Sequence, residues 1–114
     1  MYAQIVQNDG PRSPELIAAS DRAGVERILP TLRADAEVRD AVVATFVLRG
    51  ADGTEVVVIV CDTEEALQRG NELIMGTTLL PGEDPALLPG PDRVQTLPVV
   101  RAFGRNLEPI EVSA

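Results

Sequence analysis

The sequence predicts an α+β fold in which the order strand, helix, strand occurs twice. Three observations support this prediction. Short runs rich in β-branched residues alternate with two stretches of helical periodicity, and Gly and Pro residues separate these segments. The chain has 114 residues, a length that suits one domain with one hydrophobic core.

The first strand and the start of the first helix follow from residues 2–15. YAQIVQ, residues 2–7, contains a β-branched pair and ends at the turn sequence NDGP. Ser13, Pro14 and Glu15 are then typical of a helix start, as N-cap, first-turn proline and early acid. We expect this helix to run to about residue 35.

Two residues interrupt the helical pattern of that segment. Gly24 weakens a helix interior, and Pro30 cannot donate a backbone hydrogen bond. We therefore expect a break near residues 20–24 or a kink before Pro30.

A β-hairpin is predicted in the middle of the chain. Residues 41–50 (AVVATFVLRG) and 55–61 (EVVVIVC) are rich in β-branched residues, and the polar segment between them contains Asp52-Gly53. Cys61 closes the second strand and is interpreted as a small core residue.

A second helix and a last strand complete the predicted fold. Asp62 lies three residues before Glu65, a capping-box spacing that predicts a helix ending near Gly76. Its apolar face is formed by Ala66, Leu67, Gly70, Leu73 and Ile74. Residues 93–103 (RVQTLPVVRAF) predict the last strand, in which Pro98 indicates an edge or a bulge.

The two halves predict a ferredoxin-like βαββαβ domain over residues 1–103, with an antiparallel sheet and two helices on one face. The run Val-Val-Val-Ile-Val at 56–60 does not alternate, so the other sheet face must also be covered. We therefore expect a homodimer whose sheets face each other as a barrel-like sandwich. The tail, residues 104–114, contains Ile110 and Val112 and either crosses to the partner subunit or frays.

Charge and hydropathy argue against nucleic-acid and membrane partners. The net charge is −8, and the basic residues form no run that could follow a phosphate backbone. Apolar runs are far shorter than a membrane span, and the N-terminal residues lack the pattern of a signal peptide. With a single cysteine, the composition agrees with a cytoplasmic protein.

Missing residue types restrict the chemistry. The chain has no His and no Lys, which excludes imidazole bases, imidazole metal or haem ligands, and Schiff-base chemistry. One cysteine cannot build a structural zinc site. We expect no metal and no cofactor, so that chemistry would depend on carboxylates, amides, hydroxyls, Arg, the thiol or the substrate itself.

Four segments carry a resemblance to a known family: MYAQIV, ILPTLRAD, the hairpin that runs into DTEEAL, and DRVQTLPVV. They resemble the dimeric α/β barrel superfamily and, within it, the antibiotic-biosynthesis-monooxygenase-like (ABM-like) proteins. This resemblance, and the dimeric α/β barrel that it implies, covers about residues 1–103. Members of this family include cofactor-free oxygenases of hydroquinone-like aromatics, haem-degrading enzymes and many proteins of unknown role. Enzymatic members tend to use an Asn or a similar polar residue from the first strand with Trp and His from the second helix. Here the first strand offers Gln7 and Asn8, and the absence of Trp and His disfavours haem degradation.

Three polar residues are candidates for ligand binding. Gln7 ends the first strand, where its amide either points into a cleft or begins the turn. Thr45 lies in an apolar row, which predicts a buried hydroxyl that needs a hydrogen-bond partner. Asn71 is a mediocre helix former inside the second helix, and it is either a functional amide or an exposed residue.

The most unusual segment is the loop GTTLLPGEDPALLPGPD, residues 76–92. Loops longer than about 12–15 residues are uncommon in compact domains and are often lids or binding loops. Leu79 and Leu80 are therefore candidate ligand contacts in a semi-rigid apolar lid, and the alternative is a loop that covers the dimer edge.

Together these patterns predict a site for a small hydrophobic or aromatic ligand. The leading hypothesis is a cofactor-free monooxygenase of phenolic or quinol substrates. The alternative is a non-catalytic ligand-binding, regulatory or structural dimeric module.

Overall fold

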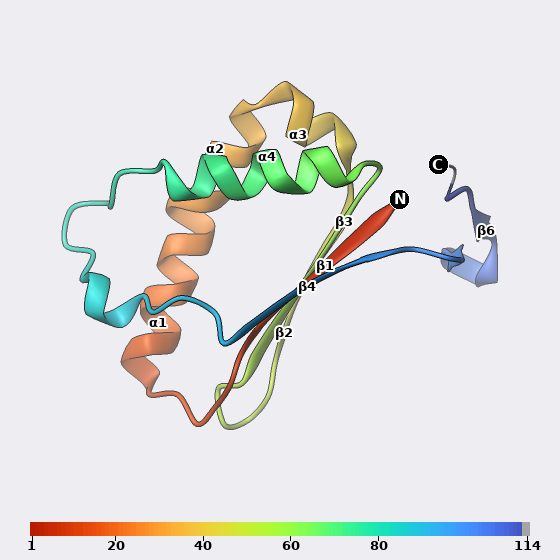
Figure 1. The fold of residues 1–114 in the computed structure, drawn as a ribbon. Helices are drawn as coiled ribbons and strands as arrows, with labels where there is room; N and C mark the ends of the chain where they lie inside the picture. Colours follow the sequence, from red (N-terminus) through yellow and green to blue (C-terminus); the bar gives the residue numbers. More distant parts are fainter. Residues whose placement is uncertain (113–114) are drawn as a thin grey trace.

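Four antiparallel strands form the main sheet of the protein, which a computed structural model describes over residues 1–112 (Figure 1). Their bounds are β1 (Tyr2–Asn8), β2 (Val42–Arg49), β3 (Glu55–Cys61) and β4 (Arg93–Pro98). The order across the sheet is β2-β3-β1-β4, and every neighbouring pair is antiparallel. The predicted α+β class with an antiparallel sheet is confirmed, and the strand order is compatible with a ferredoxin-like fold.

The helices lie together on one side of this sheet (Figure 1). They are α1 (Pro14–Arg22), the π-helical segment η1 (Ala23–Ile28), α2 (Leu29–Ala34), α3 (Ala36–Ala41) and α4 (Glu64–Met75). None of the helices within residues 1–112 is long and apolar enough to cross a membrane.

The first helical segment continues through the positions where a break or a kink was predicted. The backbone remains right-handed helical at Ala23 and Leu29, and the Leu29 N–H donates to the Gly24 carbonyl, five residues earlier. The wider π-helical turn redirects hydrogen bonds just before Pro30, whose nitrogen has no N–H to donate. The sequence therefore changes the type of helix here and does not end it.

Helix α3 was not predicted. Asp35 caps it, because its carboxylate accepts a hydrogen bond from the Val38 N–H at 3.0 Å, and Glu37 adds negative charge to the first turn. Arg69 of α4 binds the same carboxylate, and its hydrogen bonds lower the pKa of Asp35 to about 2.

The cap of α4 differs by one residue from the prediction. The Thr63 hydroxyl, and not Asp62, accepts from the helix backbone, at 3.2 Å from the Ala66 nitrogen. Thr63 has the extended backbone that an N-cap needs, so the predicted Asp62–Glu65 capping box was wrong. The helix ends at Gly76 as predicted.

The core between α4 and the sheet is small. Cys61 is 1% exposed and packs with Ala66 and Leu67, which confirms its interpretation as a core residue. Burial raises the pKa of the Cys61 thiol, so this cysteine is not activated as a nucleophile.

The opposite face of the sheet is apolar and exposed. Directly opposite residues of neighbouring strands share a face, and the pairs Phe46–Val58 and Val58–Ile5 lie on the side away from the helices. Phe46 and Leu48 are 57% and 52% exposed there. No helix within residues 1–112 covers this outer face (Figure 1).

The C-terminal segment forms a separate hairpin. The predicted last strand stops at Pro98, and β5 (Ala102–Phe103) pairs instead with β6 (Pro109–Ile110) around the short helix η3 (Arg105–Leu107). Figure 1 shows this hairpin projecting away from the main sheet. Residues 104–112 of the predicted tail are therefore folded, whereas residues 113–114 lie outside the described part.

Candidate functional site

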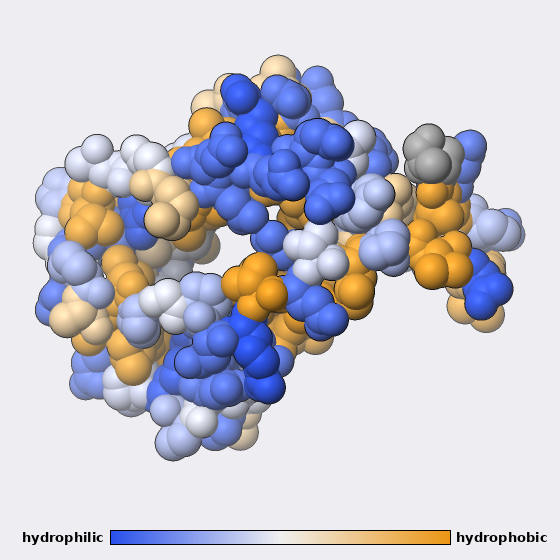
Figure 2. Space-filling model, viewed as in Figure 1, coloured by the Kyte–Doolittle hydropathy of each residue, from blue (hydrophilic) through white to orange (hydrophobic). Residues whose placement is uncertain are grey.

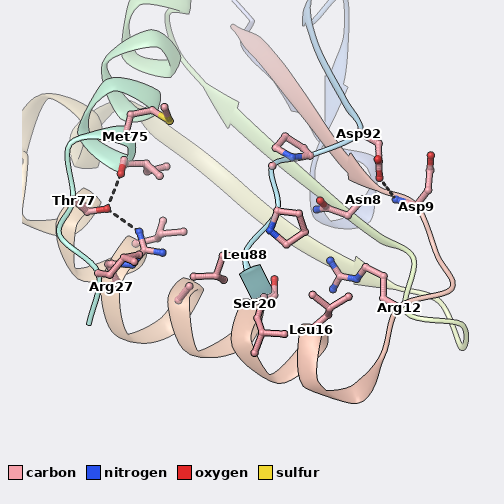
Figure 3. Close-up of a pocket in the computed structure, with 18 of the residues that line it drawn as sticks. Asn8, Asp9, Arg12, Leu16, Ser20, Arg27, Met75, Thr77, Leu88 and Asp92 are labelled. Carbon is pink, nitrogen blue, oxygen red and sulfur yellow. Dashed lines mark hydrogen bonds between the residues drawn. The ribbon is translucent and has the colours of Figure 1, made fainter. Parts of the chain in front are cut away.

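A cavity of about 610 Å³ lies beside α1 and η1, between the C-terminal end of α4, loop 77–92 and the end of β1 (Figures 2 and 3). Figure 2 shows the molecule hollowed at this place. Most of the wall is apolar, and a few polar and charged side chains lie at its two ends. The apolar side chains come from α1, η1, the end of α4 and the loop, and they include Leu16, Ile28, Ile74, Met75, Leu79, Leu87 and Leu88.

Residues 77–92 form one side of this cavity. The loop leaves α4, passes α1 and returns to β4 (Figure 1). The cavity is therefore lined by two parts of the chain that are remote in sequence, this loop and the α1–η1 segment. It contains one turn of 3₁₀-helix, η2 (Pro85–Leu87), capped by Asp84, whose carboxylate accepts from the Ala86 N–H at 2.9 Å. The loop is therefore an ordered wall of the cavity.

Two arginines of the helical layer hold the loop in place. The Arg27 guanidinium donates to both carboxylate oxygens of Glu83, at 2.9 and 3.3 Å, and its third nitrogen donates to the Thr77 hydroxyl at 2.7 Å. Arg22 donates to the Pro81 carbonyl at 2.7 Å. We call the group Arg27, Glu83 and Thr77 the loop clamp.

Glu83 is the buried acid of the loop clamp, with a side chain that is 3% exposed. Its carboxylate accepts a hydrogen bond from the Leu80 N–H at 2.6 Å as well as those from Arg27. The pKa of Glu83 therefore lies below its usual value of 4.5. The hydrogen bond from the Leu80 N–H is the main cause, and the Arg27 guanidinium is a further cause.

Arg12 lies at the other end of the cavity. Its backbone N–H donates to the Asp52 carbonyl at 2.9 Å, so the turn between β2 and β3 fixes the start of the side chain. Gly53 makes this approach possible, because a Cβ atom there would lie 3.0 Å from the Arg12 Cβ and its φ of +88° favours glycine. The guanidinium points from this turn into the cavity, beside Asn8 and Leu16 (Figure 3).

The Arg12 guanidinium is enclosed but poorly paired. Its Nε and Nη2 atoms are buried and form no hydrogen bond within residues 1–112. The Glu55 carboxylate is 3.8 Å from Nη2, beyond hydrogen-bond distance, and it already accepts from Arg49 at 2.5 Å and from Ser20 at 3.4 Å. Arg12 thus brings a positive charge and unused donors to the cavity.

Two carboxylates lie at the rim near Arg12. Asp92 accepts a hydrogen bond from the Asp9 N–H at 2.6 Å, which joins the ends of β1 and β4 (Figure 3). The Asp9 side chain accepts from Arg93 at 2.9 Å, so its charge is balanced within the protein.

The structure does not bring the predicted site residues together in one site. Leu79 lines the cavity, whereas Leu80 does not and contributes its N–H to Glu83. Asn71 is an exposed residue of α4. Gln7 lies near the end of β1, where its side-chain amide donates to the Asp9 carboxylate at 2.8 Å.

Thr45 is not the buried hydroxyl that the sequence predicted. It is exposed on β2, which is an edge strand of the main sheet. It lines a second, smaller hollow of about 190 Å³ against α2 and α3. The buried-hydroxyl interpretation was therefore wrong.

The sequence did not identify Arg12 or Arg27 as site residues. Each is an isolated arginine, and the partners that fix its position lie 40 residues or more away in the chain. For this end of the cavity the sequence offered only the amides of Gln7 and Asn8 at the end of the first strand, and of these two Asn8 lines the cavity.

Comparisons of the chain with protein-family models, with curated proteins and with solved structures found no match. Residues 1–112 contain no group of three or more His, Cys, Asp or Glu residues placed to hold a metal ion.

Proposed function

We propose that this protein binds a small, flat, largely apolar molecule, such as a phenol or a quinol, in the cavity beneath loop 77–92. The observation that carries the proposal is the cavity itself. Ligand sites are typically about 300–1,000 Å³, with apolar walls and a few convergent polar groups. This cavity has a volume of about 610 Å³ and places Asn8 and Arg12 at one end of an apolar wall.

The reaction we propose at this site is cofactor-free oxygenation. A phenolic or quinol substrate would supply its own electrons to dioxygen, so that one oxygen atom enters the product and the other leaves as water. The protein would exclude water and stabilise an oxyanion through the Asn8 amide and the Arg12 guanidinium. The resemblance of residues 1–103 to ABM-like proteins supports this reaction.

Ligand binding without turnover is the second candidate. It is favoured by the lack of His and by the pairing of Asp9 with Arg93, which leaves this rim carboxylate committed to an ion pair. Oxygen uptake separates the two functions, because only an oxygenase consumes dioxygen with its substrate.

The first test is a thermal-shift titration with 1,4-naphthohydroquinone and 2-naphthol. Ligand binding raises apparent stability by mass action, so a saturable rise in melting temperature is expected. Leu88→Trp, which fills the cavity, should abolish the rise, and Val25→Trp, at an exposed position of η1, should retain it. No shift with either compound would contradict an aromatic ligand.

An oxygen-electrode assay under the same conditions then tests the reaction. Uptake above the background autoxidation that is lost in Leu88→Trp supports the oxygenase. Saturable binding without uptake supports the ligand-binding function.

We also propose that the outer face of the sheet forms a homodimer, in which two sheets pack as a barrel-like sandwich. An exposed apolar face that includes Phe46, Leu48 and Leu97 requires cover in water. The C-terminal hairpin projects from the sheet with Phe103 and Leu107 exposed, which suits contact with the second copy.

Light scattering coupled to size exclusion tests the dimer. Phe46→Glu should convert the wild-type dimer to a monomer without unfolding, because Phe46 is already more than half exposed. Val25→Glu adds the same charge on the helical side and should remain dimeric. A wild-type protein that is monomeric at high micromolar concentration would contradict this assembly.

A further inference from the structure

The geometry points to Arg12 as the residue that selects an anionic ligand: a singly charged organic anion whose carboxylate or phenolate oxygen accepts hydrogen bonds from the Arg12 guanidinium. This inference rests on the proposed function of the cavity as a ligand site and specifies which class of molecule fills it.

The pairing of the cavity arginines carries the inference. Arg27 uses Nε, Nη1 and Nη2 in hydrogen bonds to Glu83 and Thr77, as expected of a buried guanidinium. Arg12 is equally enclosed, with 11% of its side chain exposed against 12% for Arg27, yet two of its three nitrogens have no acceptor within residues 1–112. Of these two arginines, only Arg12 still has donors to offer.

The neighbours of Arg12 do not supply the missing acceptor. Glu55 lies 3.8 Å away, and its two oxygens are engaged by Arg49 and Ser20. The turn between β2 and β3 fixes the backbone of Arg12, so the side chain cannot move far toward a new partner in the protein. A ligand that enters the cavity can supply the missing acceptor. A small rotation of the Arg12 guanidinium would then bring its free donors to the ligand.

The same surroundings define the rest of the ligand. Asp92 and Glu55 are near enough to disfavour a second negative charge, so a phosphate or dicarboxylate fits less well than a single carboxylate or phenolate. The wall beyond Arg12 is formed by Leu16 and Leu88 and is completed by the prolines of the loop. The ligand is therefore an anion at one end and apolar over most of its length.

Matched probes test this orientation. We would measure binding of 2-naphthoate and of 2-naphthamide, which differ mainly in charge, by calorimetry with the full chain. Wild-type protein is expected to prefer the carboxylate by about 10- to 100-fold, the range for a hydrogen-bonded buried charge pair. Arg12→Gln should remove that preference, while Arg101→Gln, which lowers the net charge equally at an exposed position, should keep it.

A second probe distinguishes a phenolate from a carboxylate. The phenolate of 4-nitrophenol is yellow, so its protonation can be followed by absorbance while it is bound. If Arg12 holds a phenolate oxygen, bound 4-nitrophenol should ionise at lower pH than free 4-nitrophenol, and Arg12→Gln should reverse this shift. Preference for naphthoate without any shift of nitrophenol assigns the site to carboxylates.

Two outcomes would contradict the inference, and they have different consequences for the proposed function. If naphthamide binds as tightly as naphthoate and Arg12→Gln changes neither affinity, the inference is wrong and the cavity is still a ligand site. If none of the three probes binds saturably, both the inference and the proposed function are overturned. Circular dichroism and melting of Arg12→Gln, together with its retained binding of naphthamide, show that any lost preference does not result from unfolding.

Discussion

Arg27 and Arg12 enter the same cavity from opposite ends, and their guanidinium groups differ in how many hydrogen-bond partners the protein supplies (Figure 3). At the loop end, Arg27 closes a network with Glu83 and Thr77, so the protein satisfies its own polar groups. At the sheet end, Arg12 is fixed through its backbone while two guanidinium nitrogens have no acceptor in the described chain.

This difference separates a structural arginine from one available for binding. A buried donor without an acceptor costs stability, and a protein that uses arginine only for structure avoids that cost by pairing it. The loop clamp holds the wall of the cavity, and Arg12 provides the charge inside it. Stability measurements alone should therefore distinguish the two ends.

The largest effect is expected from Arg27→Met. This change leaves the Glu83 carboxylate enclosed without its counter-charge and releases Thr77, so the loop loses its attachment to η1. We expect the melting temperature to fall by roughly 5–10 °C. Arg33→Met, at an exposed position of α2, is the control, and a fall no larger than in this control would show that the loop clamp does not stabilise the fold.

Acidification should also destabilise the protein through the loop clamp, by less than Arg27→Met does. Because folding lowers the pKa of Glu83, its ionised form stabilises the folded state above the unfolded pKa, and this contribution disappears as the pH falls through the folded pKa. Urea unfolding of wild type and Glu83→Gln should therefore differ most near pH 7 and converge toward pH 3.

Glu108→Gln is the matched control, because it removes the same negative charge at an exposed position of the C-terminal segment. The pH dependence of Glu83→Gln is measured relative to this variant. A Glu83→Gln difference that depends on pH no more than that of Glu108→Gln would contradict the role of the ionised Glu83 carboxylate.

The smallest effect on stability is expected from Arg12→Met, which removes donors that have no acceptor and keeps an apolar stem against the β2–β3 turn. Glu55 retains Arg49 and Ser20 as partners. The free energy of unfolding should change by less than about 1 kcal/mol or rise. A loss as large as that of Arg27→Met, measured by the same urea titration, would show that Arg12 is a structural arginine as well.

The sequence predicted the elements that depend on local patterns. The strand at 55–61 and the C-terminal end of α4 at Gly76 agree with the structure, because a β-branched run and a helix-ending glycine are local signals. Helix α3 was missed although Asp35 and Glu37 form a usable start signal, since the preceding helix was expected to end near residue 35 and no further element was expected before the strand at 41–50.

The candidate site was predicted only where the loop forms it. The leucines and prolines of residues 76–92 indicated a lid, and Leu79 does line the cavity. Arg12 gave no signal, because its position depends on Asp52, in a turn 40 residues later, and on the lack of a side chain at Gly53. Thr45 was misjudged because an apolar strand does not reveal which of its residues lie at an uncovered edge.

The most direct test of the account is hydrogen–deuterium exchange of the full chain with and without saturating 2-naphthoate, at two protein concentrations. If the cavity binds the anion between the loop and Arg12, amides of residues 79–88 and those around Arg12 should exchange more slowly with ligand at both concentrations. If their exchange depends on protein concentration and not on naphthoate, the loop covers a subunit edge, and the account of a ligand site beneath it is contradicted.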